Sequence, residues 1–337
     1  MGEAGRILLA HGAGGKLSHR LIELFVDAFD NPVLQQLNDQ AVLDPPGSRI
    51  AFTTDSYVVD PIFFPGGDIG RLSVCGTVND LAVGGAEPLY MSASFIIEEG
   101  LPLDELERIV HSMAREAASC GVKIVTGDTK VVERGKGDKL FINTAGVGRV
   151  RDGMELGPSR IRPGDVVILS GTVGDHGMAV LTKRKGLEID IPVESDCAPL
   201  HTLVAAMIDA SRGGIRAMRD PTRGGLATIL NELCESSGCG MLIEEERIPV
   251  RSEVRGGCEL LGLDPLYLAN EGKLVAVVDR DCATAVLEAA RKNHLGRDAA
   301  LIGEVLEGPS ARLLLETSVG NRRILEKLSG EQLPRIC

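Results

Sequence analysis

The stretch TTDSYVVDPIFFPGGDIGRLSVCGTVNDLAVGGAEP, residues 53–88, decides the fold of the first half of the chain. It opens with a strand pattern around Asp55 and continues into a helix pattern of small residues over 68–85. Asp68 stands where a helix N-cap is preferred, and a glycine pair stands where the helix should end. Asp80 falls inside this apolar helix, so its carboxylate should need a polar partner.

Helix and strand patterns alternate along the rest of the chain, which predicts an α+β protein with two mixed αβ domains. A segment at 151–163 that contains prolines and glycines marks the boundary, so we expect domains at 1–155 and 156–329. Residues 330–337 lack periodicity and are expected to form a mobile tail. The expected helices cover 17–29, 68–85, 102–120, 176–184, 199–212, 224–237, 281–293 and 320–328, and the expected strands cover 50–54, 57–59, 89–97, 122–126, 139–150, 166–170, 241–243, 273–278, 300–306 and 311–315.

The composition excludes several classes of protein. The chain has 337 residues and a formal net charge of −12 without a basic block, which argues against nucleic-acid binding. Its 3 Tyr and 7 Phe residues and its lack of Trp provide few side chains that could stack on bases. No apolar run is long enough to span a membrane, and the 8 cysteines include no C-x-x-C pair. We therefore expect a cytoplasmic protein with reduced thiols, without a membrane anchor or a structural zinc ion.

Three features suggest that the chain binds a phosphate group with a metal ion. The segment HGAGGK at 11–16 precedes a helix pattern, and its main-chain amides could approach an anion, although a flexible turn would have the same composition. The turn DPTRGGLA at 220–227 also leads into a helix, and suits either phosphate binding or tight packing. Asp55, Asp80 and Asp128 come from three segments, and converging oxygen ligands suit Mg²⁺ on a nucleotide. Taken singly, each aspartate is more often a cap or turn residue.

Four further residues carry reactive groups, each with a plainer alternative. Lys130 could meet a transferred phosphoryl group, or lie at the surface of a strand edge. His176, in the glycine-rich turn 171–177, could act as a base or simply cap or pack. Glu271 stands before a strand, where it could take a proton or form a turn. Cys337 ends the chain, where an open thiol could carry a covalent group or be accidental.

Together these motifs resemble one family over essentially the whole chain. They resemble the HypE family of hydrogenase maturation factors, the carbamoyl dehydratases of nickel–iron hydrogenase assembly. That family lies within the superfamily of aminoimidazole ribonucleotide synthetase-like ATP enzymes, in which a terminal PRIC is highly specific to it. The resemblance rests on HGAGG at 11–15, the stretch at 53–88, TGDTKVVERG at 126–135, SGTVGDHGMAVL at 170–181, DPTRGGLATILNE at 220–232, NEGK at 270–273 and PRIC at 334–337.

The resemblance implies a fold and an activity. The fold would be two aminoimidazole ribonucleotide synthetase-like domains with a flexible tail, in a homodimer whose first domains form a shared barrel near ATP. The carbamoyltransferase maturation factor HypF would load a carbamoyl group onto Cys337. The chain would use ATP to dehydrate that group to a thiocyanate, giving ADP and phosphate. The cyano group would then pass to the HypC–HypD scaffold complex.

The resemblance also implies roles for single residues. Cys337 would carry the reacting group, and Lys130 would stabilise charge on the transferred phosphoryl or carbamoyl oxygen. Glu271 would remove protons, with His176 as a further candidate. Two overlapping sets would bind the cofactors: Asp55, Asp80 and Asp128 for Mg²⁺, and Gly12, Gly14, Gly15, Asp55, Asn79, Asp80, Asp128, Asp220 and Arg223 for ATP.

Other functions share part of this pattern. Selenophosphate synthetases and thiamine phosphate kinases of the same superfamily share the acids and the D-x-T-x-G-G turn, but neither accounts for the terminal PRIC. A selenophosphate synthetase would also be expected to carry a cysteine or selenocysteine within residues 1–20, which contain no cysteine. A docking scaffold that uses the tail as a binding peptide would not hydrolyse ATP in response to a carbamoylated Cys337.

Overall fold

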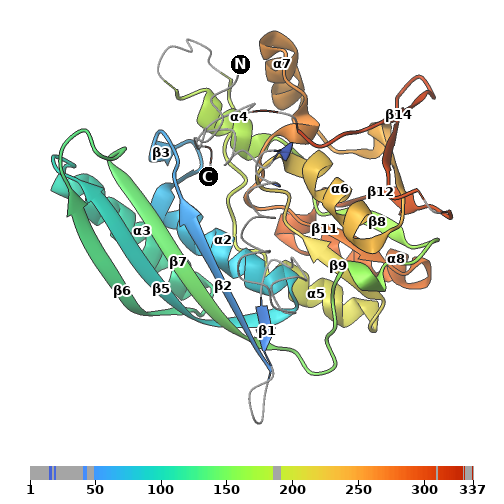
Figure 1. The fold of residues 1–337 in the computed structure, drawn as a ribbon, viewed down its shortest axis with the longest axis horizontal. Helices are drawn as coiled ribbons and strands as arrows, with labels where there is room; N and C mark the ends of the chain where they lie inside the picture. Colours follow the sequence, from blue (N-terminus) through green and yellow to red (C-terminus); the bar gives the residue numbers. More distant parts are fainter. Residues whose placement is uncertain are drawn as a thin grey trace.

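The fold is given by a computed structural model, which confirms the predicted mixed α and β architecture (Figure 1). The structure describes residues 15, 16, 19, 41–43, 49–184, 191–308, 310–328, 330 and 336. Within these ranges, no helix is both long and apolar enough to cross a membrane.

The first half of the chain forms a five-stranded sheet in the order β1-β2-β7-β5-β6. Only β5 and β6 run parallel, and the other neighbours are antiparallel. Helices α2 and α3 pack on one face of this sheet and bury a shared apolar core (Figure 1). The elements are β1 Ala41–Leu43, β2 Ile50–Tyr57, β3 Phe63–Phe64, β4 Gly67–Asp68, α2 Ile69–Val83, β5 Ala86–Glu98, α3 Leu103–Ser119, β6 Lys123–Val132 and β7 Leu140–Val150.

Helix α2 lies between the two halves of the molecule (Figure 1). The carboxylate of Asp68 accepts hydrogen bonds from the main-chain amides of Gly70 (2.8 Å) and Arg71 (3.0 Å), which confirms the predicted N-cap. Its small residues permit a close approach to the sheet, since a Cβ atom on Gly76 would lie 2.3 Å from the hydroxyl oxygen of Tyr57. The other side of α2 packs against α5, so this one helix fixes the position of the first sheet relative to the second half.

The second half forms a seven-stranded mixed sheet in the order β14-β13-β10-β12-β8-β11-β9. Helices α5 and α8 cover one face and α6 covers the other, so the central strands β8 and β11 are completely buried. The elements are β8 Val166–Leu169, α4 Asp175–Leu181, α5 His201–Ser211, β9 Ile215–Arg219, α6 Gly225–Ser237, β10 Met241–Glu244, α7 Ser252–Leu261, β11 Val275–Val278, α8 Ala283–Lys292, β12 Ala300–Val305, β13 Leu313–Glu316 and β14 Arg322–Ile324.

The structure corrects part of the sequence-based prediction. The helix expected over 320–328 is wrong: residues 322–324 form β14, which pairs antiparallel with β13. Pairing with β13 outweighs the helical spacing of a short segment. Helix α7 and strand β9 were not predicted, and α7 carries Gly256 and Gly257 in its interior, which weaken its helical signal. Of the helix expected over 17–29, only residue 19 is among the described residues.

Candidate active site

A cavity of about 180 Å³ lies between the two halves of the molecule. Strand β2, helix α2, the turn before α6 and the segment before β11 all contribute to its wall. It brings together five residues that the sequence assigned to binding or catalysis. The lining residues are Thr53, Thr54, Asp55, Tyr57, Gly76, Asp80, Asp220, Thr222, Arg223, Ile229 and Glu271.

The two aspartates from the first half enter the cavity from neighbouring elements. Asp80 comes from the last turns of α2, and its Oδ2 accepts a hydrogen bond from the hydroxyl of Thr53 at 2.9 Å. This contact provides the polar partner that the apolar helix required. Asp55 lies on β2, where its Oδ1 accepts a hydrogen bond from the amide of Ser56 at 2.7 Å.

The carboxyl group of Glu271 is buried in the wall of the cavity. Its side chain is 2% exposed, and its Oε1 has no hydrogen-bond partner among the described residues. Burial raises the pKa of Glu271 well above its ordinary value, and nearby Cys197, Asp220, Asp196 and Asp55 raise it further. The carboxyl group therefore keeps its proton to a higher pH than an exposed glutamate does.

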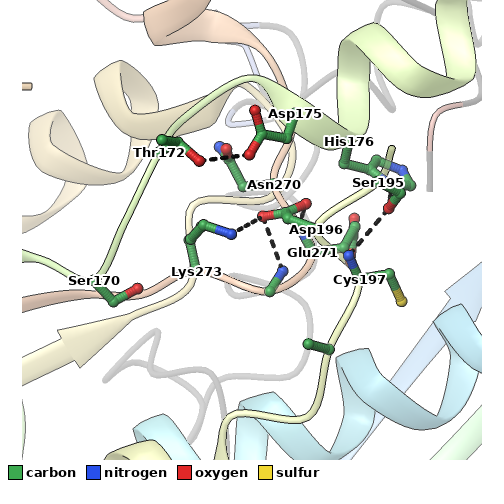
Figure 2. Close-up of polar contacts among 12 residues, drawn as sticks. Ser170, Thr172, Asp175, His176, Ser195, Asp196, Cys197, Asn270, Glu271 and Lys273 are labelled. Carbon is green, nitrogen blue, oxygen red and sulfur yellow. Dashed lines mark hydrogen bonds and ion pairs between the residues drawn. The ribbon is translucent and has the colours of Figure 1, made fainter. Parts of the chain in front are cut away.

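Asp196 fixes the main chain around Glu271 (Figure 2). Its carboxylate accepts hydrogen bonds from the amides of Glu271 (3.0 Å) and Gly272 (3.2 Å) and pairs with Lys273 Nζ at 3.1 Å. Burial opposes its ionisation, but Lys273, His176 and the Glu271 amide outweigh burial, so the pKa of Asp196 lies below its ordinary value. Position 272 admits only glycine, because a Cβ atom there would lie 1.8 Å from the Asp196 carbonyl oxygen.

His176, at the start of α4, lies beside this segment and does not line the cavity. Its Nδ1 is 2.8 Å from the hydroxyl of Ser195, and its Nε2 is 2.8 Å from the carbonyl oxygen of Ile336 (Figure 2 shows the His176 and Ser195 side chains). Burial lowers the pKa of His176, so the imidazole favours its neutral form. Nε2–H then donates to Ile336, and Nδ1 accepts from Ser195. Both ring nitrogens are thus engaged.

Lys130 and Asp128 lie on the edge strand β6, away from the cavity of the same chain. Lys130 Nζ pairs with Asp128 Oδ2 at 3.0 Å, and both side chains are exposed. Strands β7 and β5 separate β6 from β2, which carries Asp55. Asp128 therefore does not join Asp55 and Asp80 within one chain. Across the described part of the chain, no three His, Cys, Asp or Glu side chains are grouped so as to hold a metal ion.

Two predicted nucleotide ligands, Asn79 and Gly15, make contacts within the protein. Asn79 Nδ2 donates to the carbonyl oxygens of Ala198 (3.1 Å) and Glu271 (3.2 Å), and its Oδ1 accepts from the Leu200 amide at 2.7 Å. It thereby ties α2 to the second half. A Cβ atom on Gly15 would lie 2.2 Å from the carbonyl oxygen of Leu328, so Gly15 packs against that main chain. Three further predicted residues lie outside the described residues: Gly12, Gly14 and Cys337.

Sequence reasoning missed the segment Ser195–Cys197, which contacts both His176 and Glu271. The signal was weak because the segment lies in a stretch without periodicity between two helices. In the sequence, the only signal that could have pointed to this segment is the acid and cysteine pair Asp196 and Cys197.

Comparison with known proteins identifies the family. Residues 37–150 match the N-terminal domain, and residues 162–316 the C-terminal domain, of AIR synthase related protein. A carbamoyl dehydratase HypE from Cupriavidus necator is 57% identical over 337 residues, which cover 99% of this chain and 96% of the relative. The chain belongs to the HypE family.

Solved structures of the HypE family share the fold closely. One is a crystal structure of a HypE–HypF complex, with a TM-score of 0.87 and 48% identity over 91% of this chain and 99% of that chain. Another is a HypE crystal structure in complex with ATP, with a TM-score of 0.82 and 50% identity over 98% of this chain and all of that chain (100%). The predicted family is therefore confirmed, while the roles of the individual site residues remain predictions.

Proposed function

We propose that this chain is a carbamoyl dehydratase that uses ATP to convert an S-carbamoyl group on its own Cys337 into a thiocyanate. The cyano group would supply the cyanide ligands of nickel–iron hydrogenase. One observation supports a reaction within the same chain: Ile336, directly before Cys337, is buried and hydrogen-bonded to His176. His176 contacts Ser195, and the next residue, Asp196, contacts Glu271, so the end of the chain reaches the region of the cavity.

The chemistry explains why ATP is required. An amide oxygen is a poor leaving group, but transfer of the terminal phosphoryl group of ATP to this oxygen makes it leave as phosphate. The nitrogen loses both protons, the C–O bond breaks and a C≡N bond forms, with ADP and phosphate as the other products. A base must take the nitrogen protons, and ionised Glu271 is suited to this because its raised pKa makes it a stronger base than an ordinary carboxylate.

The cavity offers oxygen ligands to a cation beside a nucleotide, although the described side chains of one chain do not complete a metal site. Asp55, Asp80 and Asp220 line it, and the buried Oε1 of Glu271 lacks a protein partner among the described residues. Mg²⁺ prefers such oxygen ligands, and when bound it would neutralise the triphosphate of ATP. Arg223, at the turn before α6, would contact the phosphates, and Asp55 and Asp80 would be the ligands that this chain supplies to the metal ion.

A second copy of the chain would bring Asp128 and Lys130 to the site. Strand β6 is exposed on both faces, and the part of the chain that the structure describes leaves its outer edge unpaired. The uncovered face of the sheet also exposes Phe52, Tyr90 and Ile96. An unpaired strand edge beside an exposed apolar face is a surface on which another chain can pair. We infer a homodimer in which β6 of one chain lies beside the cavity of the other.

The reaction also requires partners and a suitable compartment. By similarity to the HypE–HypF complex, HypF would load the tail, and a HypC–HypD scaffold would accept the cyano group. The described cysteines are free thiols, which suits the reducing cytoplasm.

Replacement of Glu271 by glutamine tests the assignment of the base. After loading of Cys337, the Glu271→Gln variant should dehydrate the carbamoyl group about 10²- to 10⁴-fold more slowly in a single turnover, the usual contribution of a general base. Glu253→Gln, on the exposed start of α7, should react at the wild-type rate. A wild-type rate for Glu271→Gln would refute the role of Glu271, and a wild-type protein that forms no thiocyanate would refute the function.

A further inference from the structure

His176 makes a specific contact with the end of the chain. Its neutral ring donates from Nε2 to the main-chain carbonyl of Ile336, while Ser195 occupies Nδ1. The edge-to-face contact with Phe64, at 5.3 Å between ring centroids, holds the plane of the imidazole. The ring is completely buried, so its orientation is fixed by these three neighbours.

Ile336 is itself seated in the protein. Its side chain is 5% exposed and belongs to the same buried apolar cluster as Phe64, Val180, Cys197 and Ala269. A tail residue is thus held in two ways, by burial of an aliphatic side chain and by one hydrogen bond to its carbonyl.

We propose that His176 is a positioning residue that holds the C-terminal tail at the active site through the Ile336 carbonyl. The role of this contact in catalysis rests on the proposed function, whereas the hydrogen bond itself is part of the structure. It differs from proton removal by His176, because both ring nitrogens are already engaged.

The segment Ser195–Cys197 links the tail to the base. Ser195 accepts a hydrogen bond from the Cys197 amide at 3.1 Å and contacts His176 at 2.8 Å. Asp196, between them, holds the amides of Glu271 and Gly272. Ile336 and the main chain of Glu271 are therefore both linked to three consecutive residues.

The contact recognises the main chain and not the thiol. Empty, carbamoylated and cyanated tails should therefore all accept the His176 hydrogen bond. The apolar cluster adds a preference for an aliphatic side chain at 336. Release of Ile336 to a partner would require the loss of its hydrogen bond to His176 and the exposure of its side chain, each of which opposes release.

The test compares His176→Phe with His176→Gln. Phenylalanine keeps the ring beside Phe64 but cannot donate, whereas glutamine can donate to the Ile336 carbonyl. The measurement is the rate at which iodoacetamide alkylates Cys337, without ATP or partners, read by the mass of the peptide 332–337 released by cleavage after Glu331. His111→Phe, an exposed histidine on α3, is the matched control.

We expect His176→Phe to raise the alkylation rate about tenfold, the effect of one lost hydrogen bond, with ATP binding unchanged. His176→Gln should restore most of the protection, and His111→Phe should behave as wild type. Ser195→Ala, which removes only the hydroxyl that orients the ring, should raise the rate less and provides a second variant if His176→Phe does not fold.

Three results would overturn the inference. One is unchanged alkylation in both His176→Phe and Ser195→Ala. Another is a glutamine variant that is as reactive as the phenylalanine variant. The third is loss of dehydration in His176→Phe with full protection of Cys337, which would make His176 catalytic. The two alkylation readouts do not depend on whether the wild-type protein forms thiocyanate, so failure of the proposed function would be recognised separately.

Discussion

The carboxyl group of Glu271 combines deep burial with the proximity of several acids. A buried carboxyl surrounded by other acids keeps its proton to a higher pH than an exposed one. Proton removal requires the ionised carboxylate. The environment that makes Glu271 a strong base therefore also lowers the fraction of Glu271 that is ionised at a given pH. Asp196 differs, because main-chain amides and Lys273 stabilise its charge.

The dehydration rate should depend on pH through Glu271. Because burial raises its pKa, the ionised fraction grows as pH rises well above the range in which ordinary glutamates titrate. The single-turnover rate of the wild type should therefore increase with pH across that range and then level off. Glu271→Gln should lose this acidic limb. An unchanged acidic limb in the glutamine variant would assign it to another group.

At the scale of elements, helix α2 shows what sequence can predict. Its cap, its small residues and its terminal glycines are local features, and the structure confirms the helix with bounds close to those expected.

Strand β14 shows the opposite case. Residues 322–324 are held by pairing with β13, a contact that helical spacing cannot report. The segment Ser195–Cys197 was missed for the same reason, since its contacts lie far along the chain.

Removal of the α2 cap should destabilise the molecule. Asp68→Ala deletes two hydrogen bonds to the first turn, and we expect a loss of about 1 kcal/mol in the free energy of unfolding. Denaturant titration would measure the change. Asp104→Ala, in the first turn of α3 without a capping contact, should have a smaller effect. Equal losses of unfolding free energy in the two variants would show that the capping hydrogen bonds of Asp68 do not stabilise the protein.

At the scale of the whole molecule, the site was predicted in part. The acids of β2, α2 and the two turns line one cavity, and their roles there stay predictions. Lys130 and Asp128 lie on an exposed strand of the same chain, because the sheet order separates β6 from β2. No pattern in a single sequence gives the order of strands or the position of a second copy, and these decide whether the predicted residues converge.

The exposed strand β6 should mediate the homodimer. Val131 is 68% exposed on this strand, so Val131→Lys should place a charge in the interface and shift the molar mass measured by light scattering from two chains towards one. Val319→Lys, at a residue 79% exposed in the turn between β13 and β14, should leave the mass unchanged. A monomeric wild type, or a dimeric Val131→Lys variant, would contradict the interface.

In the proposed reaction, Cys337 carries the group that is dehydrated. Its most direct test is the intact mass of the protein and of its C-terminal peptide, after loading by HypF and then after addition of ATP with Mg²⁺. We expect a carbamoyl adduct on Cys337 that loses the mass of one water molecule only when ATP is present, and no adduct in Cys337→Ala. A carbamoyl adduct whose mass stays unchanged while ATP is hydrolysed, or thiocyanate formed by Cys337→Ala, would contradict it.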